Sequence, residues 1–218
     1  MIFGKIEYLN LLPFHLFMKR YIHSSSAKMS MEYKKNVPAK INQAFHKRHV
    51  DAAFISSISA KRSSYVPLGI VAKREVKSVL VIPNRANKRD KESASSNLLA
   101  ALLGVEGEVL IGDKALRYAL ENSDYIDLAE LWHKKYKLPF VFALLCYHKG
   151  ENEYRKIRQE FLKRQVKIPQ YILEKASKRT AIEKREIVEY LKLISYEIDA
   201  KALKGLHKFY KESASYLR

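Results

Sequence analysis

The first 60 residues alternate between the hydrophobic spacing of strands and that of helices. Apolar residues follow one another or alternate with polar ones in the strand-like segments, and recur every three or four positions in the helical ones. The predicted elements are strand 2–8, helix 12–21, strand 28–33, a helix from Pro38 to about His49, and strand 51–55. Because a strand–helix–strand order pairs its strands in parallel through right-handed crossovers, this region predicts an α/β fold.

A second, smaller α/β unit is predicted in the middle of the chain. Before it come a short helix or loop at residues 57–64, the apolar strands 66–72 and 78–83, and a highly charged stretch at 84–91. The alternation of strands and helices then resumes with helix 95–103, strand 108–111, helices 113–120 and 127–136, and strand 139–145.

The last third of the chain is predicted to be helical. Beyond Gly150 no strand pattern remains. Amphipathic spacing there predicts three helices, at residues 154–173, 179–194 and 199–217.

The order of these elements predicts two lobes with a ligand cleft between them. The chain crosses from one unit to the other near residues 72–80 and 140–146. We therefore expect one lobe from residues 1–75 and 146–218, which includes the C-terminal helices, and another from residues 76–145. Such a pair closes over its ligand by hinge bending and excludes water.

The composition is that of a globular protein that can bury a full core, with 47% hydrophobic residues in a chain of 218. The apolar stretch at residues 8–18 is interrupted by polar residues and lacks a small-residue cleavage site, so we predict no signal peptide. No apolar run reaches the roughly 18 residues of a membrane span, and the single cysteine, Cys146, has no partner for an internal disulfide. These features favour a cytoplasmic protein without a membrane partner.

The chain is strongly basic, with 41 Lys and Arg against 23 Asp and Glu, a formal net charge of +18. Residues 1–150 carry +11 of this charge and residues 151–218 carry +7, so no single arm or stripe holds it. Neither an aromatic RNA-recognition pattern nor paired metal-ligand cysteines are present, so we predict no nucleic-acid partner. A general positive field would instead steer a small anionic substrate toward a cleft.

Small neutral hydrogen-bonding residues stand at the junctions between predicted strands and helices. They are Asn10, Ser56, Ser57, Ser95, Ser96 and Gly112. Helix N-termini present unpaired N–H groups and a positive dipole end, so several of them at one cleft would bind carboxylates. Ser57, Ser95 and Ser96 are also explained as helix caps, and Asp113 is better explained that way. Ser78 differs, because it begins a strand beside the predicted hinge, where no helix needs a cap.

The sequence predicts neither a metal nor a cofactor. Seven glycines form no phosphate-cradling loop, and the seven histidines show metal-type spacing only at His46 and His49, on a lysine-rich helix end. Cys146 follows an apolar strand and is best interpreted as a buried, inert thiol.

Six short regions carry a resemblance to a known family. In chain order they are YLN with Pro13 at 8–13, DAAFISS at 51–57, VKSVL at 76–80, SASS at 93–96, IGDKAL at 111–116, and DLAELW with LPFVFA at 127–132 and 138–143. Together they resemble the chorismate dehydratase family of the futalosine route to menaquinone, and the resemblance covers essentially the whole chain. The sequence departs from the family at Ser95, where threonine is usual, and at Leu145-Cys146, where a tryptophan tends to follow.

The resemblance implies a two-lobed, periplasmic-binding-protein-like fold of type II and the conversion of chorismate to 3-[(1-carboxyvinyl)oxy]benzoate and water. Asn10 would bind a polar group of the ring, and Ser78 would contact the departing hydroxyl or a carboxylate. The junction serines and Gly112 would hold the two carboxylates. Because no ionisable side chain occupies the motif positions that face the cleft, we expect the substrate's own side-chain carboxylate to take the C3 proton.

Two other functions remain open at this stage. A sister enzyme of the same pathway forms 1,4-dihydroxy-6-naphthoate on the same fold, with a different opening motif and a histidine in its cleft. A non-catalytic receptor for small anions would bind chorismate without changing it. The sequence does not indicate an oligomeric state.

Overall fold

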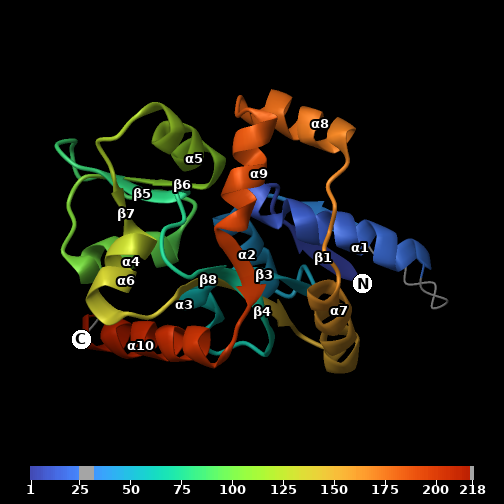
Figure 1. Ribbon diagram of the computed structural model, residues 1–218. Helices are drawn as coiled ribbons and strands as arrows, with labels where there is room; N and C mark the ends of the chain where they lie inside the picture. The colour runs from blue at the N-terminus through green and yellow to red at the C-terminus, as the bar shows by residue number, and fades with distance from the viewer. Residues whose placement is uncertain (25–31, 217–218) are drawn as a thin grey trace.

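The computed structural model describes residues 1–24 and 32–216 and contains two β-sheets flanked by helices (Figure 1). The strands of the larger sheet are β1 (Ile2–Lys5), β2 (Glu32–Lys35), β3 (Ala52–Ser56), β4 (Tyr65–Ala72), β8 (Phe140–Tyr147) and β9 (Ile194–Glu197). The smaller sheet consists of β5 (Val79–Ile82), β6 (Glu108–Ile111) and β7 (Ile126–Asp127).

Ten α-helices and one 3₁₀-helix connect and cover these strands within the described residues. They are η1 (Leu9–Leu11), α1 (Leu12–Ser24), α2 (Pro38–His46), α3 (Ser57–Ala60), α4 (Ala94–Leu103), α5 (Gly112–Glu121), α6 (Leu128–Tyr136), α7 (Glu151–Lys163), α8 (Gln170–Thr180), α9 (Lys184–Lys192) and α10 (Ala200–Tyr216). The α/β class predicted from the sequence is confirmed.

The larger sheet has the strand order β2-β1-β3-β8-β4-β9. Strand β1 pairs in parallel with both β2 and β3, as the strand–helix–strand pattern predicts, and β8 runs antiparallel to β3 and β4. All five residues of β3 are buried, because helices or other chain segments cover both faces of this central strand. Of the predicted strand 28–33, residues 28–31 lie outside the described residues.

The smaller sheet has the order β6-β5-β7, with both neighbours antiparallel to β5. Helices α4, α5 and α6 surround it (Figure 1). The Asp127 carboxylate fixes the segment by which the chain enters this unit, since it accepts N–H bonds from Val76 and Lys77 at 2.8 and 2.7 Å and also caps α6. Burial raises the pKa of Asp127, and these N–H bonds act in the opposite direction.

The C-terminal region differs from the sequence prediction in two ways. The predicted helix 154–173 is two helices, α7 and α8, because Pro169 prevents a continuous helix through this point. The prediction that no strand follows Gly150 is wrong: β9 adds to the edge of the larger sheet by pairing antiparallel with β4. The two-residue strand β7 was also not predicted.

Helix α10 lies along the lower side of both units in Figure 1 and packs against β8 and α4. Its Phe209 ring contacts Phe140, at 5.0 Å between ring centroids, and Phe140 in turn contacts Trp132 of α6 at 5.3 Å. The helix approaches the returning chain so closely that a Cβ atom on Gly205 would lie 2.1 Å from the Pro139 carbonyl oxygen. Glycine at this position is therefore required by packing.

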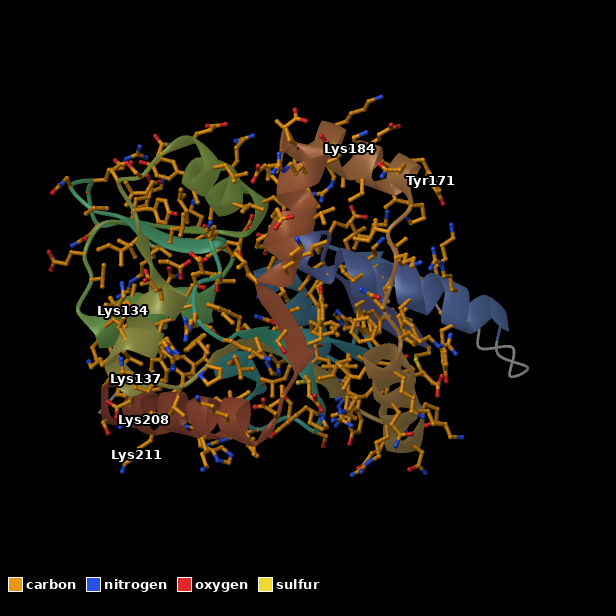
Figure 2. The ribbon with its side chains drawn as sticks, viewed as in Figure 1. Lys134, Lys137, Tyr171, Lys184, Lys208 and Lys211 are labelled. Atoms are coloured by element: carbon orange, nitrogen blue, oxygen red, sulfur yellow. The ribbon has the colours of Figure 1, made fainter. Side chains whose placement is uncertain are left out.

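Basic side chains are distributed over the whole molecule. Figure 2 shows Lys134 of α6 and Lys137, which follows this helix, near Lys208 and Lys211 of α10, whereas Lys184 lies at the opposite end. None of the helices in the described part of the chain has the length and apolar character needed to span a bilayer.

Candidate active site

A cavity with about 620 Å³ of empty space, open solvent at its mouth included, lies where the two sheets approach each other. Its apolar wall combines Phe54 and Phe142 of the larger sheet with Val79 and Ile111 of the smaller sheet. The polar residues of the lining are Tyr8, Asn10, Ser56, Ser78, Ser93 and Ser96. None of the described residues that line this cavity is acidic, basic or a histidine.

Five of the seven site residues predicted from the sequence line this cavity: Asn10, Ser56, Ser78, Ser96 and Gly112. They come from segments as far apart as η1 and α5, so the fold brings together residues spread over the first half of the chain.

Ser57 and Ser95 do not line the cavity. Both are fully buried, and their hydroxyls bond to protein groups. Ser57 Oγ donates to the carbonyl of Val141 in β8, and Ser95 Oγ accepts the N–H of Ile58 at 3.0 Å. These hydroxyls therefore connect α3 with its neighbours, and a role of either serine in binding substrate stays a prediction.

The two residues predicted to be catalytic share one neighbour, Tyr190 of α9. The Tyr190 hydroxyl forms a hydrogen bond with Ser78 Oγ at 2.9 Å, and the Asn10 side chain lies close enough to the phenol to influence its pKa. Burial raises the pKa of Tyr190 well above its usual range, while Ser78 and Asn10 act in the opposite direction.

A second tyrosine holds the backbone of Asn10. The Tyr196 hydroxyl, from β9, donates to the Asn10 carbonyl at 2.6 Å. Neither tyrosine was predicted as a site residue, because the sequence pattern of an amphipathic segment does not distinguish a site aromatic residue from a core one.

Ser56 and Ser96 are each oriented by a partner that the sequence analysis did not identify. The buried Asn42 side chain donates to Ser56 Oγ at 2.8 Å and accepts the Ser56 N–H at 3.2 Å. Ser93 caps α4, since its Oγ accepts the Ser96 N–H at 3.1 Å and donates to Ser96 Oγ at 2.8 Å. The positive end of α4 therefore lies at the cavity wall.

Gly112 sits at the start of α5 with a left-handed backbone, φ +67°. The Tyr8 ring packs so closely on it that a Cβ atom at position 112 would lie 2.6 Å from Tyr8 Cζ. The Gly112 N–H donates to the Ser78 carbonyl at 2.8 Å, which fixes Ser78 from the backbone side. The Tyr8 hydroxyl donates to Glu92, and burial raises the pKa of Tyr8.

Asp113 connects the two units beside the cavity, and its interpretation as a helix cap is wrong. It is the second residue of α5, whose N-cap position is Ile111. Its carboxylate accepts the Leu9 N–H at 2.9 Å and pairs with Arg179 of α8 at 2.9 Å. Burial raises the pKa of Asp113, and these two partners act against that rise.

The described residues contain no group of three or more His, Cys, Asp or Glu side chains that could hold a metal ion. Cys146 is buried in β8, and burial raises the pKa of its thiol. The chemistry available at the cavity is therefore that of hydroxyls, amides and backbone N–H groups.

Comparison with known proteins places this arrangement in a family. A family model described as "Menaquinone biosynthesis" matches residues 1–106 and 91–215. The chain belongs to this menaquinone biosynthesis family. A protein named chorismate dehydratase from Campylobacter jejuni subsp. jejuni serotype O:23/36 (strain 81-176) is 44% identical over 215 residues, which cover 97% of this chain and 96% of that protein.

Solved structures confirm the fold expected for the family. Protein AF1704 from Archaeoglobus fulgidus is similar with a TM-score of 0.66 at 12% identity, covering 99% of this chain and 97% of that chain. The Candida albicans CA3427 gene product, described as having the generic periplasmic binding protein fold, gives 0.55 at 14% identity, covering 99% and 90%. The periplasmic aliphatic sulphonate binding protein SsuA from Escherichia coli gives 0.55 at 13% identity, covering 100% and 87%.

Proposed function

We propose that this protein is a chorismate dehydratase, a lyase that removes water from chorismate to form 3-[(1-carboxyvinyl)oxy]benzoate in the futalosine route to menaquinone. The observation that carries the proposal is that Asn10 and Ser78 lie together on the wall of one cavity between the two units, whose described lining residues carry no charge. The relative named chorismate dehydratase, similar over nearly the full length of both chains, supports it independently.

The reaction needs a proton acceptor for C3 and a path for the C4 hydroxyl. The C3–H electron pair moves into the ring as the C3 proton passes to the base, and the C4–O bond breaks. The base then passes the proton to the departing hydroxyl, which leaves as water. The aromatic ring of the product supplies much of the driving force. Ser78 donates a hydrogen bond to the departing hydroxyl, and Asn10 binds a polar group of the ring near the reacting carbons.

The substrate brings the base. Because none of the described lining residues is ionisable at neutral pH, the side-chain carboxylate of chorismate accepts the C3 proton, and the enzyme holds that carboxylate in reach. A correctly held intramolecular base is equivalent to a very high effective concentration of external base. Positioning is therefore the main contribution of the protein.

Two helix N-termini suit the two carboxylates. Helix α4 begins at the Ser93–Ser96 turn, and α5 begins at Gly112. Both helix starts lie on the cavity wall. Backbone N–H groups and hydroxyls at such ends stabilise anions without a cationic side chain. The substrate dicarboxylate thus fits the polar groups of the lining.

A non-catalytic anion receptor is the second candidate, because the same fold occurs in a sulphonate-binding protein. The sister enzyme that forms 1,4-dihydroxy-6-naphthoate is disfavoured, since it would need a histidine in its cleft and none of the described lining residues is one.

One experiment separates these functions. Purified protein is mixed with chorismate without added metal or nucleotide, and the aromatic ether is followed by mass spectrometry and ultraviolet absorbance. Catalytic formation of the ether supports the dehydratase. Chorismate that binds and is recovered unchanged would identify a receptor.

A further inference from the structure

Tyr190 lies directly behind the two side chains assigned to the chemistry. It is 4% exposed, and it is separated from Ser78 by 112 positions in the sequence. It does not line the cavity itself, so its contact with the site passes through Ser78 and Asn10.

We propose that Tyr190 is a positioning residue that fixes the Ser78 hydroxyl as a hydrogen-bond donor toward the leaving hydroxyl of the substrate. The inference rests on the proposed function and adds to it the group that sets the direction of the Ser78 proton.

The number of hydrogens on the two hydroxyls limits how they can bond. A hydroxyl carries one hydrogen and accepts through two lone pairs. The buried Tyr190 hydroxyl needs an acceptor for its hydrogen, and Ser78 Oγ, 2.9 Å away, is the acceptor that the described residues provide. In that role Ser78 accepts a hydrogen bond from the protein interior and keeps its own hydrogen for the cavity. If Ser78 donated to Tyr190 instead, its hydrogen would point away from the substrate.

Both partners of the Tyr190–Ser78 hydrogen bond are fixed by the surrounding structure. On one side, the Gly112 N–H binds the Ser78 carbonyl, which leaves the serine side chain as the adjustable part. On the other, Tyr190 is buried on α9, and Tyr196 of the following strand binds the Asn10 carbonyl. The α9–β9 segment therefore supplies one phenol to each of the two predicted catalytic residues.

Accepting a hydrogen bond also makes a hydroxyl a better donor, since linked hydrogen bonds polarise one another. Burial keeps Tyr190 protonated, because its pKa is raised well above the usual range of a phenol. The Tyr190 hydrogen is thus present across the pH range in which the enzyme works.

A double-mutant cycle tests this role. Tyr190→Phe keeps the ring and removes only the hydroxyl, and we expect kcat to fall by about tenfold with KM changed by less than about threefold. In a Ser78→Ala background the same substitution is expected to cause no further loss, because the serine hydrogen that Tyr190 orients is gone. A phenol with a merely structural role would lower kcat by the same factor in both backgrounds.

Tyr154→Phe is the matched control, since Tyr154 is a buried phenol of α7 that donates to Met1 Sδ at 3.0 Å, away from the cavity. It should leave kcat unchanged. Equal kcat in wild type and Tyr190→Phe, or losses that multiply in the double variant, would overturn the inference.

The proposed function and this inference fail in different ways. A wild-type protein that leaves chorismate unchanged contradicts the dehydratase. The same four proteins of the cycle are then compared by calorimetric titration with chorismate. A weaker affinity of Tyr190→Phe that disappears in the Ser78→Ala background still supports the positioning role, and equal affinities of wild type and Tyr190→Phe contradict it.

Discussion

His15 makes the stability of this protein depend on pH in a window set by its burial. Its Nε2 bonds to the Ile6 carbonyl at 2.9 Å, and its Nδ1 is buried without a partner among the described residues. Burial lowers the pKa of His15 from 6.5 to about 4, outweighing the bond to Ile6, which raises it. Between these values the unfolded chain binds a proton that the folded chain excludes, so the free energy of unfolding falls as the pH falls.

The size of the effect follows from the two pKa values. Lowering the pH from 7 to 5 is expected to reduce the free energy of unfolding by about 2 kcal/mol through His15, and the full effect below pH 4 is about 3 kcal/mol. Urea unfolding at pH 7 and pH 5 measures it. His15→Gln should lose much of this pH dependence, because the amide can still donate to the Ile6 carbonyl but does not titrate in this range.

The control is His207→Gln, which removes an exposed histidine of α10. It should lose as much stability between pH 7 and pH 5 as the wild type. If wild type and His15→Gln lose the same amount between the two pH values, His15 is protonated in the folded state and the reasoning from burial is wrong.

Three further predictions concern the cavity. Asn10→Ala should lower kcat for chorismate at least about 100-fold in steady-state assays, because it removes an oriented polar group beside the reacting carbons; unchanged turnover would contradict the assignment. Gly112→Ala should lower the free energy of unfolding by about 1–3 kcal/mol in urea titrations, since it combines left-handed backbone strain with a clash against Tyr8. A stability equal to that of the wild type would show that the Tyr8 ring moves freely. Arg179→Met should raise KM about two- to fivefold with little change in kcat, because the pair with Asp113 joins the two units beside the cavity. A fall in kcat alone would assign the arginine to the chemistry instead.

The first two thirds of the fold could be predicted because its elements have strong local patterns. Strand β3 is a run of buried residues, and α4 and α6 begin at side chains that cap them, Ser93 and Asp127. Strand β9 lacked such a signal, because four residues at a sheet edge continue the apolar spacing of the helix before them. The break at Pro169 did have a signal, and the helix predicted across it ignored the rule that proline ends helices.

The candidate site was predictable where residues lie at strand ends and not where distant segments meet. Asn10 and Gly112 were singled out because ligands bind at the junctions of strands and helices in α/β proteins, and Ser78 because it begins a strand beside the predicted hinge. Tyr190 and Tyr196 reach the same site from 112 and 186 positions away, a proximity that only the three-dimensional fold creates.

The uncharged lining is consistent with a substrate that carries its own base. A protein carboxylate in this cavity would face two substrate carboxylates in a region of low dielectric constant, and repulsion between like charges there is much stronger than in water. Oriented dipoles avoid this repulsion, since helix ends and hydroxyls bind the anions without adding a charge that must be desolvated. Because the proposed elimination only requires the substrate carboxylate to be held near C3, it needs no ionisable protein base. Such a base at the same place would weaken the binding of the anionic substrate on which the proposed geometry depends.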